Sequence, residues 1–116
     1  MSVVWRIRLA DSAEMDLLDI ADWTRDNFGP RQAMIYTETI TLAITALHNG
    51  PDVLGSKPRD EIETGIRTLH VARQGRSGRH FVVFREAPSQ IIDVLRILHD
   101  SMDLGRHLVS PKNEPH

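Results

Sequence analysis

The chain has 116 residues with no cysteine, and its 14 basic and 16 acidic side chains give a net charge of −2. This length suits a single domain, the lack of cysteine excludes disulfide and thiolate chemistry, and the charge is far from the basic excess of a dedicated nucleic-acid binder. The longest uncharged run, Thr39–Pro51, is too short for a membrane span of about 20 residues, and early charges interrupt any signal-peptide core, so we expect a soluble cytoplasmic protein.

Residues 3–9, VVWRIRL, predict a first strand with one buried face. Alternation places Trp5, Ile7 and Leu9 on that face and the two arginines on the other. One-sided burial of this kind indicates an edge strand or a sheet with one face exposed to solvent.

An amphipathic helix is predicted over residues 11–28. Asp11 is the expected N-cap, and Glu14 three residues later resembles a capping box. Its predicted core face consists of Ala13, Leu17, Ile20, Ala21, Thr24 and Phe28. The opposite face carries Asp16, Asp19 and Asp26. We expect this acidic face to be solvated, with contact to a basic partner segment as the alternative.

A second helix is predicted over residues 31–48, after a break at Gly29-Pro30 and before a stop at Asn49-Gly50-Pro51. Its predicted core face consists of Ala33, Tyr36, Thr37, Ile40, Ile44 and Leu47. This helix also carries more apolar residues than one core contact would need, namely Met34, Ile35, Leu42 and Ala46. The surplus indicates a docking surface, and simple packing in the core is the alternative. The short connection between the helices makes them an antiparallel hairpin.

The second half of the chain predicts a sheet. Residues 51–65 are expected to form a wrapping loop, and strands are predicted over residues 66–73, 79–85 and 91–98. Apolar residues on both parities of the last strand indicate an interior strand covered on both faces. The predicted fold is α+β with the order β-α-α-β-β-β, in which the helical hairpin packs on one face of a small, mainly antiparallel sheet.

Charge divides the chain. Residues 1–64 hold 6 basic and 11 acidic side chains, a net of −5, whereas residues 65–116 hold 8 and 5, a net of +3. Five of the six histidines also lie in the second half. The strand-rich half is therefore mildly basic and the helical half acidic.

The last predicted strand runs into the polar string His99-x-x-Met102-Asp103-x-x-Arg106-His107-Leu108. This string resembles the C-terminus of the ParE toxins, which belong to the RelE/ParE superfamily of bacterial toxin–antitoxin modules. Three shorter strings also look like ParE chains: Phe28-Gly29, Asn49-Gly50-Pro51, and Pro58-Arg59-Asp60-Glu61 leading to Gly65-Ile66-Arg67. The resemblance covers residues 3–108, which we take as one toxin domain followed by a flexible tail over residues 109–116.

The resemblance implies a growth-inhibiting toxin that is neutralised by a small antitoxin and forms a hetero-oligomer with it. Characterised ParE toxins poison DNA gyrase, whereas the RelE branch cuts messenger RNA on the ribosome. Antitoxins of the family lay a C-terminal segment, disordered when free, across the hairpin and the sheet. We favour a protein-binding toxin without catalytic residues, cofactor or sequence-specific nucleic-acid contact. A RelE-like endoribonuclease and a non-toxic, degenerate binding module remain as alternatives.

Candidate site residues follow from this resemblance. Target binding is assigned to His99, Met102, Asp103, Arg106 and His107, and antitoxin binding to Met34, Ile35, Leu42, Ala46, Arg67 and Arg79. The endoribonuclease alternative would use Arg73, Arg85, His99 and His107, because RNA cleavage needs proton-transfer groups and cations for the phosphate. RelE-type enzymes often place a tyrosine or histidine near the C-terminus, but Tyr36 lies in mid-helix.

Structural roles compete with these assignments. His99 lies at a strand end and could be a hydrogen-bonded structural histidine, and Met102 could fill a core position. Asp103 could cap the following turn or form an ion pair with Arg106. A metal site is not expected, because the turn after the strand breaks the helical spacing of His99, Asp103 and His107.

Overall fold

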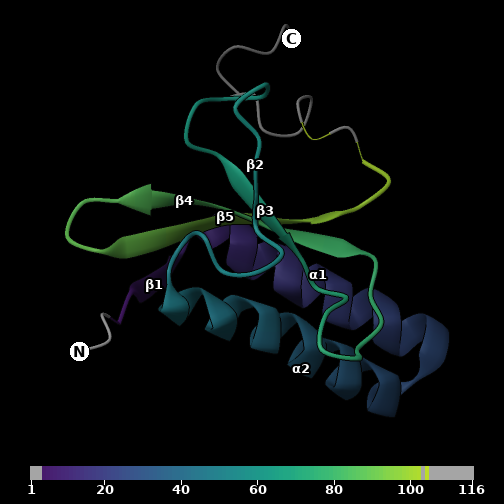
Figure 1. The fold of residues 1–116 in the computed structure, drawn as a ribbon. Helices are drawn as coiled ribbons and strands as arrows, with labels where there is room; N and C mark the ends of the chain where they lie inside the picture. Colours follow the sequence, from purple (N-terminus) through teal and green to yellow (C-terminus); the bar gives the residue numbers. More distant parts are fainter. Residues whose placement is uncertain (1–3, 103, 105–116) are drawn as a thin grey trace, which may run out of the picture.

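The computed structural model describes residues 4–102 and 104, and it confirms the predicted α+β fold (Figure 1). The elements are β1 (Arg6–Leu9), α1 (Asp11–Phe28), α2 (Pro30–Ala46), a 3₁₀ turn (Leu47–Asn49), β2 (Lys57–Pro58), β3 (Arg67–His70), β4 (His80–Ala87) and β5 (Ile91–His99). The short strand β2 lies inside the segment expected to be a wrapping loop, so that expectation was wrong there. The predicted boundary at residue 108 and the tail over residues 109–116 lie outside the described residues.

The described strands form one mixed sheet in the order β1-β5-β4-β3-β2. The strand β1 lies at one edge and pairs in parallel with β5, from Arg6 opposite Ile91 to Leu9 opposite Val94. The other pairs are antiparallel. The predictions of an edge position for the first strand and an interior position for the last are both confirmed.

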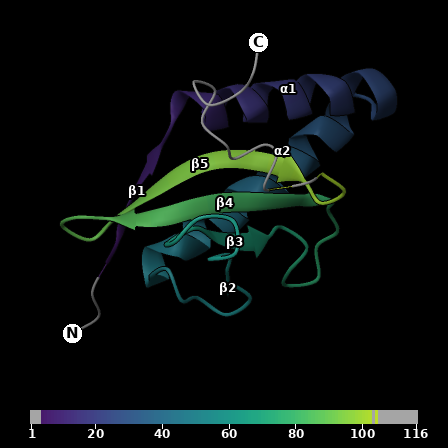
Figure 2. The same cartoon turned by 90° about the horizontal axis from the view of Figure 1, so that it is seen from above.

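Both helices lie on the same side of the sheet (Figures 1 and 2). They are joined by the single residue Gly29, whose φ of 95° favours glycine, and Pro30 is the first residue of α2. The main core lies between the hairpin and the sheet, where Leu47, Phe84 and Ile92 are fully buried. A smaller cluster covers the opposite face of the sheet and consists of Ile66, Val83 and Leu98 with the partly buried Phe81, Leu95 and Leu104.

A bulge in β5 explains why its apolar residues have both parities. Val83 pairs with Arg96 and Phe84 with Val94, so Leu95 has no partner of its own on β4. After the bulge, the alternation of side chains between the two faces of the sheet is shifted by one residue. Val94 and Ile97 therefore both lie in the main core. Leu95 and Leu98 contact the smaller cluster on the other face.

The start of α1 covers the edge of β5 where β1 has ended. The Ala10 N–H donates to the Val94 carbonyl at 2.9 Å, and the Ser12 hydroxyl to the Leu95 carbonyl at 3.0 Å. Asp16 accepts the Ile97 N–H at 2.8 Å and a bidentate bond from Arg96 at 2.8 and 3.0 Å. These bonds satisfy backbone groups that a longer β1 would otherwise pair.

Two predictions for α1 are therefore wrong. The N-cap is Ala10 without a side-chain cap, and Asp11 is the first helical residue. Asp16 is only 14% exposed and binds the sheet, so the predicted solvated acidic face does not include it.

The core faces differ from prediction at five positions. Thr39 and Ala43 are buried although they were not expected in the core. Phe28 is 63% exposed, and Thr37 is exposed although both were expected in the core. Ala46 packs against the main core instead of adding to the exposed surface, because it lies one turn after the buried Ala43 on the side of α2 that faces the core. The helices of the described chain are not long and apolar enough to cross a membrane.

Candidate functional site

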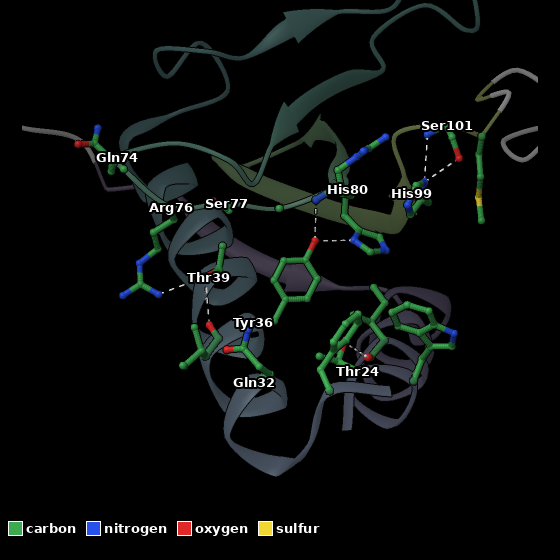
Figure 3. Close-up of a pocket in the computed structure, with 18 residues that line it drawn as sticks. Thr24, Gln32, Tyr36, Thr39, Gln74, Arg76, Ser77, His80, His99 and Ser101 are labelled. Atoms are coloured by element: carbon green, nitrogen blue, oxygen red, sulfur yellow. Dashed lines mark hydrogen bonds between the residues drawn. The ribbon is translucent and has the colours of Figure 1, made fainter. Parts of the chain in front are cut away.

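A groove of about 1340 Å³ lies between the helical hairpin and one end of the sheet (Figure 3). One wall comes from α1 and α2, and the other from the turn before β4 and the residues that follow β5. Side chains far apart in the sequence therefore meet in this groove, including Trp23, Tyr36, His80 and His99.

The helical wall of the groove presents large apolar side chains to solvent. Trp23 and Phe28 are 61% and 63% exposed, and their rings meet edge-on with centroids 5.8 Å apart. Ile35 on the same wall and Met102 on the other wall also line the groove and are 44% and 42% exposed. A contiguous exposed apolar surface in a concave site is typical of a protein-binding or ligand-binding groove.

Polar side chains on the sheet side are held by hydrogen bonds. The Arg79 N–H donates to the Tyr36 hydroxyl at 2.9 Å, and the hydroxyl lies 2.6 Å from Nδ1 of His80. The Tyr36 hydroxyl thus donates to Nδ1, which leaves the proton of the neutral His80 ring on Nε2. The Ser101 N–H donates to Nδ1 of His99 at 3.1 Å, which assigns the Nε2–H form to that ring too. The two imidazole centroids are 5.2 Å apart.

Burial and neighbouring charge keep His80 neutral. Burial, followed by the nearby His99, lowers the pKa of His80 from 6.5 to about 4. Burial also raises the pKa of the Tyr36 hydroxyl. The hydrogen bond between these two groups therefore joins their neutral forms at pH 7.

We expect nuclear magnetic resonance titration to give a midpoint near 4 for the His80 ring. The unfolded chain protonates this histidine near 6.5, so the free energy of unfolding should fall as the pH is lowered from 6.5 towards 4. Replacing His80 with glutamine should flatten this part of the curve in urea denaturation experiments. A midpoint near 6.5 for the wild-type ring would contradict the prediction.

Asp100 organises the rim of the groove. Nε2 of His70 lies 2.9 Å from its carboxylate, and Nε of Arg79 lies 3.1 Å from it. The hydrogen bond from His70, together with Arg79, lowers the pKa of Asp100 below its usual range. Nδ1 of His70 accepts the Ala72 N–H at 3.0 Å, so its Nε2–H donates to Asp100. This network fixes the end of β5, from which His99 enters the groove.

Residues 7–104 match the family described as "ParE toxin of type II toxin-antitoxin system, parDE". The chain belongs to this ParE toxin family. Toxin ParE1 of Mycobacterium tuberculosis is 33% identical over 103 residues, which are 89% of this chain and 97% of that protein. Toxin ParE1 of Caulobacter vibrioides is 28% identical over 101 residues, 87% of this chain and 95% of that protein. The predicted family and the predicted role as the toxin component of a type II system are confirmed.

Two solved structures share the fold of this ParE-family chain. The chromosomal ParDE toxin–antitoxin system from P. aeruginosa matches with a TM-score of 0.70 and 23% identity, covering 84% of this chain and 98% of that chain. The RelBE2 toxin–antitoxin complex from Mycobacterium tuberculosis matches with a TM-score of 0.52 and 19% identity, covering 84% and 99%. At these identities the likeness establishes the fold.

The structure divides the predicted target-binding residues of this ParE toxin. His99 and Met102 line the groove, whereas Asp103, Arg106 and His107 lie outside the described residues.

The predicted antitoxin-binding residues lie in four different environments. Ile35 and Arg79 line the groove, and Met34 and Leu42 are 74% and 46% exposed on α2. Ala46 packs against the core. The guanidinium of Arg67 donates to the Pro51 carbonyl and the Ser56 hydroxyl, each at 2.8 Å, and so holds the loop before β2.

The residues of the endoribonuclease alternative are not brought together within the described chain. His80 pairs with His99 at one end of β4, whereas Arg85 pairs with Asp93 five residues further along, about 16 Å away. Arg73 donates to the Leu54 carbonyl, and His107 lies outside the described residues. The described residues also contain no cluster of three side chains suited to a metal ion.

Sequence reasoning missed Trp23, Tyr36 and His80 as groove residues of this toxin. Trp23 did carry a signal, because a large aromatic off the predicted core face of α1 indicates a binding surface. Tyr36 and His80 carried none, since they are 44 residues apart and meet only through tertiary packing.

Proposed function

We propose that this toxin inhibits growth without catalysing a reaction, by binding DNA gyrase in the cytoplasm, and that a cognate antitoxin neutralises it. The match to ParE toxins over residues 7–104 carries the proposal. The gyrase step rests on the target of characterised ParE toxins. The antitoxin step is supported by the P. aeruginosa and Mycobacterium tuberculosis relatives, whose structures are toxin–antitoxin systems.

The arrangement of the basic residues supports a non-catalytic toxin. RNA cleavage would need proton-transfer groups and unengaged cations around one phosphate. In the described chain, Arg76 donates to Glu38 at 2.8 Å, and Arg79 donates to Asp100 at 3.1 Å. Arg85 lies far along β4 from the histidine pair.

Exposed apolar side chains support an antitoxin-binding surface on the hairpin. Met34 and Leu42 extend along the outer side of α2, and Ile35 leads from there into the groove with Trp23 and Phe28. We propose that an antitoxin segment follows this path, with Arg79 at the rim of the groove. Our proposed target-binding segment remains the sequence from His99 to Leu108, which includes Met102, Asp103, Arg106 and His107.

Purified toxin is expected to inhibit supercoiling by DNA gyrase and to leave ribosome-bound messenger RNA intact. Both assays should be run in parallel on one preparation, with the pre-formed antitoxin complex as the inactive control. Induced expression of the toxin should arrest growth, and co-expression of the antitoxin should restore it.

Two results would contradict the proposed function. Cleavage of messenger RNA that is abolished by His99→Leu, with folding retained, would identify an endoribonuclease. Unchanged growth on induction of folded toxin would identify a non-toxic binding module.

A further inference from the structure

Among the residues that the structure describes, those that line the groove include no aspartate or glutamate. The chain as a whole has more acidic than basic side chains, yet the charged and titratable groups of this lining are Arg76, Arg79, His80, His99 and the phenol of Tyr36. Glu38 and Asp100 bind the two arginines but do not line the groove themselves. A carboxylate of a partner can therefore enter the groove without facing an acidic side chain among its described lining residues.

Two imidazole donors stand next to each other at one end of the groove. Nδ1 of His80 is engaged by Tyr36 and Nδ1 of His99 by Ser101, so each neutral ring offers its Nε2–H (Figure 3). No hydrogen bond to either Nε2 comes from the part of the chain that the structure describes. The ring centroids lie 5.2 Å apart. One carboxylate, whose two oxygens accept several hydrogen bonds, suits such a pair of donors.

Apolar side chains form part of the groove beside this donor pair. Ile20, Trp23, Phe28, Ile35 and Met102 line the groove together with polar residues such as Thr24 and Gln32. A carboxylate that reaches the two histidines must therefore be flanked by apolar side chains that cover this wall. An amphipathic protein segment with one acidic residue among apolar anchors meets both requirements.

We propose that the antitoxin segment in this groove carries an aspartate or glutamate whose carboxylate accepts hydrogen bonds from Nε2 of His80 and His99. This inference rests on the proposed function, because it specifies the chemistry of the antitoxin at that surface. A phosphate-rich strand fits less well, since both groove arginines are engaged by carboxylates and phosphate binding relies on available cations.

The test is a double-mutant cycle between the full-length toxin and the protein encoded beside its gene, measured by isothermal titration calorimetry. In the toxin, His99 is replaced with leucine. In the antitoxin, each acidic residue is replaced in turn with alanine. His48→Leu is the matched toxin control, because His48 is an exposed histidine that does not line the groove. Circular dichroism checks that each variant is folded, and His80→Gln provides a second groove variant.

We expect His99→Leu to weaken binding tenfold to a hundredfold, roughly the effect of one hydrogen bond to a charged group. Replacing one particular antitoxin carboxylate should weaken binding by a similar factor. Combining that replacement with His99→Leu should weaken binding little further. His48→Leu should change affinity less than about twofold, as expected for a surface site outside the interface.

Additive losses at every antitoxin carboxylate would overturn the inference and leave antitoxin binding in place. The inference would also be overturned if an RNA oligonucleotide displaced the antitoxin from the wild-type toxin but not from the His99→Leu variant. Failure of the wild-type toxin to bind the neighbouring gene product would instead contradict the proposed function. These three results are distinguishable in the same set of titrations.

Discussion

Replacing Asp16 with alanine is expected to lower the free energy of unfolding by about 2–4 kcal/mol. Its carboxylate accepts two hydrogen bonds from Arg96 and one from the Ile97 N–H, all between 2.8 and 3.0 Å. Without it, a partly buried guanidinium and a backbone N–H at the edge of β5 lose their partner together. Because a charged group and a strand edge are both affected, this loss should exceed that of an ordinary surface ion pair.

Urea denaturation followed by circular dichroism measures the effect, and Asp19→Ala is its matched control. Asp19 is an exposed aspartate on the same helix, so its replacement should change stability by less than about 0.5 kcal/mol. Asp16→Asn keeps an acceptor for the Ile97 N–H, so its free energy of unfolding should lie between those of the Asp16→Ala and Asp19→Ala variants. Equal stability of the Asp16→Ala and Asp19→Ala variants would show that the contact to β5 contributes little.

Replacing Trp23 with alanine is expected to weaken antitoxin binding by at least about 2 kcal/mol, or roughly 30-fold. Trp23 lines the groove, yet 61% of its surface is exposed in the free toxin. A partner in the groove would bury much of this indole, and tryptophan is a frequent hot spot in protein interfaces. The free toxin should lose little stability, because the side chain contributes little to the core.

Leu18→Ala is a close control for Trp23→Ala. Leu18 lies on the same helix and is also 61% exposed, but it does not line the groove. Its replacement should leave the affinity for the antitoxin within about twofold, since it lies outside the proposed interface. Similar losses for the two variants, measured by calorimetry, would place the antitoxin on the outer face of α1 instead of in the groove.

The helices and the interior strand could be predicted because their signals are local. The apolar spacing of residues 11–28 and the Gly29-Pro30 break need no tertiary information, and the structure has α1 over the predicted range. Asp16 was misplaced because nothing near it in the sequence shows that β5 continues past the end of β1 and that α1 covers the open edge. The bulge at Leu95 likewise depends on the pairing of β5 with β4.

The groove was only partly predictable for the same reason. His99 and Met102 stood out through the family string at the end of the last strand, and Ile35 through surplus apolar surface on its helix. The link from Tyr36 to His80 depends on the register that places His80 opposite His99, which no local pattern reveals. Ala46 was misassigned because the apolar pattern alone does not show which side of α2 faces the core.

The parallel pairing of β1 with β5 sets when this protein can complete its fold during synthesis. Residues 6–9 are made 85 residues before their partner strand, residues 91–94. The same late strand carries the backbone groups that bind the start of α1. A nascent chain that stops before Ile91 therefore lacks the strand that joins β1 to β4, and its helices have no complete sheet to pack on. Such non-local contacts slow folding, so the sheet is completed only after residues 91–94 have left the ribosome.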